Sequence, residues 1–305
     1  METTEEHNSL APHLALLAVQ FMFGTASVLG KMALVFFPST AIVGFRVGGG
    51  ATAFYLLARF RGKLALDEKR HYLQFAVFSI FGISMNQLLF FKGLSLTTAT
   101  NASLLAVLIP VFAILVGGLL KTESLSWRKL AGILFAAAGV VYLINPAKAS
   151  FLSGTTAGDM LILANSLSYA FYLAISKKLI THYGPLRSIA WLFIFGSIVN
   201  VPVGVYSLSG IDLGEVSRTG WYALAGVVIV PTIMAYYWNT WALARVEPSV
   251  VAIYVYFQPV IGTLLAISLL GEVWNPRLLV AMILIFLGVF LATSKTKRKR
   301  ILPAA

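Results

Sequence analysis

The chain has 305 residues, of which 59% are hydrophobic and only 11% are charged, and its mean hydropathy is +0.86. This composition exceeds what the core of a water-soluble domain of that length needs, so it excludes a soluble globular protein. The net charge of +12 is mostly a matter of membrane topology and attraction to the membrane surface, because the basic residues gather between apolar stretches. We expect no nucleic-acid partner.

Apolar stretches follow one another along the chain, and most are about 20 residues long, the length that crosses a bilayer as a helix. They predict an all-α, polytopic membrane protein with ten transmembrane helices. Two links, Lys92 to Ala99 and Arg245 to Pro248, are very short, so the boundaries are soft by several residues. The expected spans are 12–33, 39–58, 72–92, 97–119, 128–145, 157–176, 187–207, 219–243, 248–270 and 277–294.

The distribution of Lys and Arg predicts the orientation in the membrane. With ten spans, 17 basic residues fall in the even-numbered loops and the C-terminal tail, and five fall on the other side. Because basic loops remain in the cytoplasm, both termini are expected there. The N-terminus resembles neither a signal nor a transit peptide, and the absence of cysteine excludes disulfides. The expected location is a bacterial inner membrane, as a multi-pass protein.

The second half of the chain repeats the first at a single offset of 149 residues. Each copy would hold five spans, an odd number, so the second copy enters the bilayer upside down relative to the first. Such inverted repeats are typical of alternating-access carriers, which bind substrate between the halves near the bilayer midplane. We expect repeats at 12–145 and 157–293, with cytoplasmic tails at 1–11 and 295–305. The repeated positions include Pro110 and Pro259, Glu123 and Glu272, Arg128 and Arg277, Leu130 and Leu279, and Gly139 and Gly288.

Pro110 and Pro259 fall near the middle of the fourth and ninth expected spans. A proline inside a helix removes one backbone hydrogen bond and kinks the helix. We expect the pair to act as gating kinks, with purely structural kinks as the alternative. The shared Glu123 and Glu272 predict interfacial pairing with nearby arginines, or a latch at each face of the membrane.

These repeated features resemble the EamA-type transporters of the drug/metabolite transporter superfamily. The resemblance rests on a Pro-containing helix, a short loop ending in Glu, nearby Arg and Trp (Trp127, Trp274), and a Gly-containing last helix in each half. It extends over about residues 12–145 and 157–293. It implies a ten-helix inverted-repeat carrier, often an exporter of amino acids or other small metabolites, with the substrate left open.

Polar and aromatic residues that differ between the two copies are the best substrate-binding candidates, because a shared scaffold does not require them. Polar groups inside a membrane must face a cavity or each other. Helical spacing places several of them on common faces, although helix packing and interhelical hydrogen bonds are alternative roles. The predicted binding residues are Asn86, Gln87, Phe90, Asn165, Tyr169, Tyr172, Tyr236, Asn239, Tyr254, Gln258 and Arg46.

The expected spans hold no Asp or Glu at mid-depth, since Asp159 lies at the start of the sixth span. A proton-driven exporter of cations would need such a carboxylate. An uncharged or zwitterionic metabolite is therefore expected, with amino acids favoured. The expected partners are this small molecule and the lipid bilayer, with a monomer as the assembly and no cofactor or metal.

Two other functions compete with the small-metabolite carrier. An exchanger of nucleotide-sugars or organophosphates needs several cations in the cavity, and only Arg46 lies at a suitable depth. The second competing function is that of an intramembrane enzyme or a receptor. The chain has four histidines, and none lies deep in an expected span, since His13 is at the very start of 12–33, so a nucleophile would lack its base. We therefore expect no enzyme.

Overall fold

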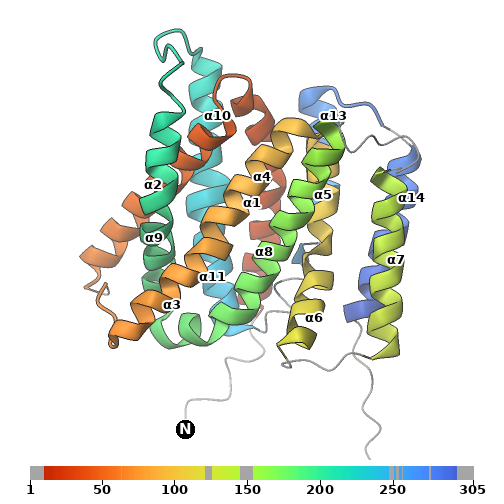
Figure 1. The fold of residues 1–305 in the computed structure, drawn as a ribbon, viewed down its shortest axis with the longest axis horizontal. Coiled ribbons are helices and arrows are strands. Elements are labelled where there is room, and N and C mark those ends of the chain that lie inside the picture. The colour runs from red at the N-terminus through yellow and green to blue at the C-terminus, as the bar shows by residue number, and fades with distance from the viewer. Residues whose placement is uncertain are drawn as a thin grey trace, which may run out of the picture.

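A computed structural model describes residues 10–62, 64–120, 126–144, 154–246, 251, 254–255, 257–274 and 276–293. Every regular element in these ranges is a helix, and the helices form one bundle. In this bundle α3 (Lys69–Ser79) and α4 (Met85–Leu96) run obliquely to α7 (Trp127–Ile144) and α14 (Pro276–Thr293) (Figure 1). We call the end at which the first helix begins the lower end, at the bottom of Figure 1, and the opposite end the upper end.

The helices of the first half follow the expected spans closely. The third span is interrupted by a π-helical turn and the fourth by a 3₁₀ turn. The elements are α1 (Ala11–Leu34), α2 (Ser39–Phe60), α3 (Lys69–Ser79), η2 (Ile80–Ser84), α4 (Met85–Leu96), α5 (Ala99–Leu105), η3 (Ala106–Leu108), α6 (Ile109–Leu119) and α7 (Trp127–Ile144).

The second half contains a π-helical turn at the corresponding place. Its elements are α8 (Gly154–Tyr183), α9 (Pro185–Tyr206), α10 (Arg218–Val228), η4 (Ile229–Met234), α11 (Ala235–Arg245), α13 (Phe257–Leu270) and α14 (Pro276–Thr293). The turns η2 and η4 begin at Ile80 and Ile229, which are 149 residues apart.

Seven helices of the described chain are long and apolar enough to cross a membrane, counting α3 to α4, α5 to α6 and α10 to α11 as continuous spans. Shorter apolar helices, Leu130–Gly139, Phe257–Leu270 and Pro276–Gly288, overlap the three remaining expected spans. The protein is therefore a multi-pass, all-helical membrane protein.

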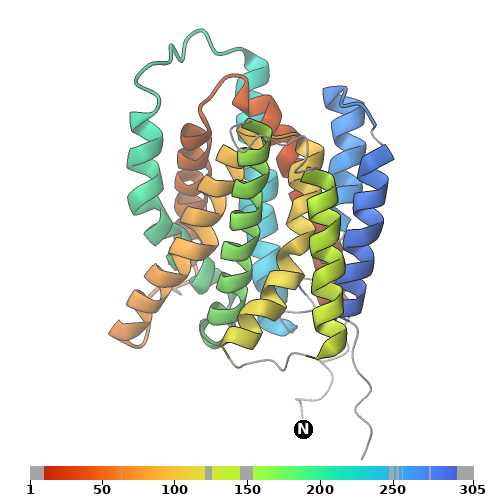
Figure 2. The ribbon, with the colours of Figure 1, turned by 45° about the vertical axis from the view of Figure 1, so that its right-hand side comes forward.

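The helices α7 and α14 pack against each other along one side of the bundle (Figures 1 and 2). Their closest approaches are reciprocal. A Cβ added to Gly139 would meet Ile285 and the Ala281 carbonyl, and one added to Gly288 would meet Ala136 and the Gly132 carbonyl. The two sets of contacts are related by the 149-residue offset, and in both the lack of a side chain lets the two backbones touch.

Contacts between distant segments hold the upper end together. The Glu272 carboxylate accepts hydrogen bonds from the backbone nitrogens of Ala99 (2.9 Å) and Thr100 (3.3 Å), at the start of α5. The Asp159 carboxylate accepts one from the Thr97 hydroxyl, at 2.5 Å. An anion at the first turn of a helix satisfies backbone donors that have no partner within the helix. Glu123, the other predicted latch residue, lies outside the described residues.

The two predicted gating prolines lie near the start of helical segments. Pro110 lies in the first turn of α6, immediately after the 3₁₀ turn η3. Pro259 is the third residue of α13. A helix's first turn needs no backbone donor, and the proline ring already has helical geometry there. Pro110 therefore lies at the break in the fourth span, while the turn before Pro259 includes residues outside the described ones, so the gating kinks stay a prediction.

Candidate functional site

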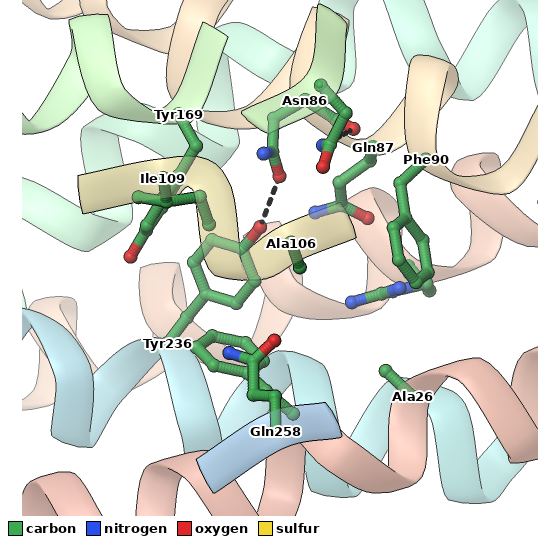
Figure 3. Close-up of a pocket in the computed structure, with 12 residues that line it drawn as sticks. Ala26, Asn86, Gln87, Phe90, Ala106, Ile109, Tyr169, Tyr236 and Gln258 are labelled. Carbon is green, nitrogen blue, oxygen red and sulfur yellow. Dashed lines mark hydrogen bonds between the residues drawn. The ribbon is translucent and has the colours of Figure 1, made fainter. Parts of the chain in front are cut away.

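A cavity of about 80 Å³ lies among α1, α2, α4, η3, α6, α8, α11 and α13, in the middle of the bundle (Figure 3). One water needs about 10–15 Å³ of such space, so the cavity has room for a few water-sized groups in this conformation. The lining residues are Phe23, Ala26, Arg46, Asn86, Gln87, Phe90, Ala106, Ile109, Asn165, Tyr169, Tyr236 and Gln258.

Residues from both halves meet across this cavity at positions that the 149-residue offset relates. Gln87 corresponds to Tyr236, and Ile109 corresponds to Gln258. Both Gln87 and Tyr236 follow a π-helical turn, which inserts one extra residue and changes the face that the following helix presents. The same backbone device thus precedes a cavity residue in each half.

Asn86 joins three helices at one wall of the cavity. The Tyr236 hydroxyl donates to its side-chain oxygen at 3.0 Å (Figure 3), and the Asn165 side-chain nitrogen donates to its backbone carbonyl at 2.6 Å. These bonds connect α4 with α11 and with α8. They orient the Tyr236 ring, which also packs edge-on against Phe23.

Tyr169 is held from outside the cavity. Asn239 on α11 donates to its hydroxyl at 2.7 Å, and the two side chains are 7% and 4% exposed. The Tyr172 ring lies beside Tyr169, with the centroids 5.7 Å apart. Asn239 therefore acts as a support for a lining residue.

Arg46 is 4% exposed and carries the cavity's cationic group. Its Nε donates to the Thr232 hydroxyl at 2.7 Å, its Nη2 reaches the Pro231 carbonyl at 3.4 Å, and the guanidinium lies 4.7 Å from the centroid of the Phe91 ring. Thr232 in turn donates to the Val227 carbonyl, at 2.8 Å. The π-helical turn η4 thus positions the guanidinium through neutral groups.

Two glutamines contribute amides to the lining in different ways. The Gln258 nitrogen donates to Gln20 at 2.6 Å, which joins α13 to α1. The side-chain oxygen and nitrogen of Gln87 are both buried without a hydrogen-bond partner among the described residues. The Gln87 amide lies near the Tyr236 hydroxyl, outside good hydrogen-bonding geometry. A buried amide without partners is uncommon in folded proteins and calls for an explanation.

Eight of the eleven predicted binding residues line the cavity, and three do not. Tyr172 packs against Gly82, with its hydroxyl next to Ser176 and Thr240. Asn239 supports Tyr169, as described above. Tyr254 lies near the lower end, where its hydroxyl is 2.7 Å from His13 Nδ1. The expectation that these three residues line the cavity is therefore corrected. Helical spacing predicts which residues share a face of a helix, but not what that face packs against.

The lining also contains residues that the sequence pattern did not single out. Phe23, Ala26, Ala106 and Ile109 are apolar, and nothing in a hydrophobic span distinguishes them from helix-packing residues. Thr232, which binds Arg46, was also missed. Its one signal in the sequence is its place beside Pro231, where a break in the helix leaves carbonyls in need of a donor.

A second and larger hollow, of about 490 Å³, lies between α2, α9 and α10. Gly44, Gly48, Val201 and Leu224 are among its lining residues, and none of its described lining residues is charged. A specific site for a small molecule needs a few convergent polar groups. The central cavity has them, so it is the candidate functional site.

The sequence model of the EamA-like transporter family matches this chain twice, at residues 10–145 and at residues 156–294. The chain belongs to the EamA-like transporter family. An uncharacterized transporter of Archaeoglobus fulgidus is 30% identical over 233 residues, which covers 76% of this chain and 80% of that protein. A probable terminal-alkyne amino-acid exporter of Streptantibioticus cattleyicolor is 26% identical over 219 residues, 72% of each protein.

One solved crystal structure superposes with a TM-score of 0.66 and covers 92% of this chain and 96% of that one. At 19% identity, this likeness supports the fold alone. The family membership identifies a membrane transporter, and it confirms the resemblance drawn from the repeated Pro and Glu positions.

Proposed function

We propose that this protein carries a small uncharged or zwitterionic metabolite, most favourably an amino acid, and exports it by alternating access. The observation that carries the proposal is the central cavity, where Gln87 and Tyr236, corresponding residues of the two halves, face the same space. Amide and hydroxyl groups between aromatic walls suit the polar and apolar parts of a small metabolite. The amino-acid exporter among the relatives favours the same substrate class.

The proposal includes two inverted five-helix repeats, 12–145 and 157–293, which give ten membrane spans. The reciprocal contacts of Gly139 and Gly288 support it, because a two-fold axis between the copies requires contacts to recur in this way. The matching positions of η2 and η4 support it too. We also place the lower end and both termini in the cytoplasm of a bacterial cell, from the distribution of Lys and Arg.

Alternating access requires the halves to separate at one end at a time. The upper end is joined by Asp159 to Thr97 and by Glu272 to the start of α5. The lower part is joined by His13 to Tyr254 and by Gln20 to Gln258. Each of these contacts links one proposed repeat to the other. With both sets formed the cavity is small, so substrate entry requires one set to break.

The test is efflux from proteoliposomes that contain the purified protein and are preloaded, in separate batches, with radiolabelled amino acids, nucleobases or sugars. Protein-dependent efflux, slowed at least tenfold by Tyr236→Leu and unchanged by Leu134→Ala, supports the proposal. Leu134 is the matched control because its side chain is 68% exposed on the outer face of α7. If no amino acid, nucleobase or sugar is moved by the wild-type protein above empty vesicles, the carrier function is rejected.

A further inference from the structure

The Arg46 guanidinium and the Gln87 amide lie in the wall of one cavity, and each lacks partners that its chemistry demands. We propose that the substrate carries a carboxylate, and that Arg46 and Gln87 bind it. This inference rests on the carrier function proposed above and narrows its substrate class. Among the uncharged and zwitterionic metabolites proposed above, the inference selects those with a carboxylate. It also adds simple organic anions to the possible substrates.

Within the described part of the chain, Arg46 has unused donors and no counter-ion. A guanidinium has five N–H donors, and the two bonds to Thr232 and Pro231 use two of them. Among the described residues, no Asp or Glu forms an ion pair with it. A buried charge without an opposite charge is strongly destabilising, and neutral oxygens compensate for it only in part. A bound anion supplies the opposite charge and the hydrogen-bond acceptors that Arg46 lacks.

Gln87 provides a second and independent observation. Its amide nitrogen and oxygen are both buried, both lack a partner in the described part of the chain, and the residue is 2% exposed. A carboxylate has two acceptor oxygens. One can accept from the guanidinium and the other from the Gln87 N–H, so a single group satisfies both donors, and the Gln87 oxygen is left to accept from another donor.

The other lining residues indicate which groups the substrate carries besides the carboxylate. Phe23, Phe90, Tyr169 and Tyr236 provide aromatic surface for an apolar body. None of the lining residues that the structure describes is Asp or Glu, so a substrate ammonium would meet only amide and hydroxyl oxygens and ring faces there. The carboxylate is therefore the required group, and the amine is dispensable. A phosphate is disfavoured because Arg46 is the one cationic residue among the described residues of the lining.

The experiment measures thermal unfolding of the full-length protein in detergent with four matched probes at equal concentration. These are L-phenylalanine, 3-phenylpropionate, phenethylamine and phenyl phosphate. A ligand that binds the folded protein raises its Tm by mass action. Both carboxylates should raise the Tm by several degrees, phenethylamine should leave it unchanged, and phenyl phosphate should act more weakly than the carboxylates.

Three variants assign the effect to the two residues. Arg46→Met should abolish the shift caused by 3-phenylpropionate, and Gln87→Leu should weaken its apparent affinity at least fivefold. Arg61→Met, on an exposed cytoplasm-side residue, should keep the full shift. If Arg46→Met fails to fold, Arg46→Lys replaces it. Lys keeps the charge but loses the fork of donors, and should retain a reduced shift.

The inference is overturned if phenethylamine or phenyl phosphate stabilises at least as well as the carboxylates, if neither carboxylate stabilises, or if the Arg46 and Gln87 variants keep the full wild-type shift. None of these results touches the carrier function, which the efflux experiment decides with amino acids, nucleobases and sugars. Efflux of nucleobases or sugars alone would leave a carrier whose substrate class we assigned wrongly.

Discussion

Neighbouring amides on α4 have opposite environments. Asn86 accepts the Tyr236 hydroxyl and, through its carbonyl, the Asn165 amide. Gln87, the next residue, has a buried amide without a partner in the described structure. The first amide stabilises the resting protein, and the second costs stability until a ligand arrives. Such a trade of stability for function is common at binding sites.

Replacing these two amides should therefore change stability in opposite directions. An unpaired buried polar group costs about 1–3 kcal/mol, so Gln87→Leu should raise the Tm of the ligand-free protein by a few degrees. Asn86→Leu leaves the Tyr236 hydroxyl without its acceptor and should lower the Tm by a similar amount. The measurement is thermal unfolding in detergent. A lower Tm for Gln87→Leu would contradict an unsatisfied amide.

Asn239 should matter for transport although it does not line the cavity. Asn239→Leu removes the donor that holds the Tyr169 hydroxyl, so we expect a several-fold higher KM for efflux. Tyr169→Phe removes the other partner of the same bond and serves as the matched variant. If the bond is the cause, the double variant should be no worse than either single one. Additive losses would assign independent roles to the two residues.

Sequence reasoning predicts the polar part of the site better than the apolar part. Asn86, Asn165 and Gln258 could be selected because a polar side chain in a membrane span must face a cavity or a partner. Phe23 and Ile109 give no such signal, since apolar residues occupy every face of a span. Tyr254 shows the converse error: its polar group finds a partner, His13, outside the cavity.

At the scale of the element, the paired π-helical turns position the candidate site. The turn η4 frees the Val227 carbonyl, which accepts from Thr232, and Thr232 accepts from Arg46. One hydroxyl thus satisfies the irregular backbone and orients the guanidinium. The turn η2 corresponds to it in the first half, where its Phe81 carbonyl accepts from Ser168 at 2.8 Å.

The hydroxyl of Thr232 can be tested by itself. Thr232→Val keeps the shape of the side chain but leaves both the Val227 carbonyl and Arg46 Nε without a partner. We expect it to destabilise the protein by about 1–3 kcal/mol, measured by thermal unfolding. Thr232→Ser keeps the hydroxyl and should stay close to the wild type. Equal losses in both variants would mean that packing of the methyl group matters, and not the hydrogen bonds.

The helices themselves were largely predictable, and the interruptions were not. Most expected span boundaries lie within a few residues of the helix ends, as for 39–58 and Ser39–Phe60, because hydropathy and bilayer thickness set them. Pro110 predicted that the fourth span is irregular, but it did not predict the kind of irregularity. A proline is compatible with an interior kink or with the start of a new helix, and the hydropathy of the span is the same in both.

At the scale of the whole molecule, the upper contacts should act as one side of a two-state gate. Glu272→Gln keeps the side-chain shape but weakens the bonds to the start of α5, so it should favour the state open at the upper end. We expect several-fold faster maleimide labelling of an Ala26→Cys cavity reporter added from that side. Glu215→Gln, on an exposed loop residue, is the control. Unchanged labelling would argue against a latch at Glu272.

The proposed orientation has a direct test, because the chain contains no cysteine. A single cysteine at Arg61, at the lower end, should resist a membrane-impermeant maleimide in intact cells and react after lysis. A cysteine at Ser209, in the loop at the upper end, should react in both. The reverse pattern would place the termini outside the cell.

The offset of 149 residues predicted which segments correspond, but not which touch. The contacts of α7 with α14 follow from it once a two-fold axis is assumed, since each helix is the other's copy. The meeting of Arg46 with Thr232 does not, because their counterparts Phe195 and Ile83 are both apolar. Departures from symmetry of this kind give the cavity its chemistry, and a sequence repeat does not predict them.

The two π-helical turns have a mechanical consequence. Each holds a surplus residue inside an otherwise regular coil, and a surplus of this kind can migrate along the coil without unwinding it. Every residue that it passes rotates by about 100° around the axis. A small slide of the surplus would thus swing Gln87 or Tyr236 out of the hollow and bring a neighbour in, so the walls could exchange their side chains while the coils stay intact.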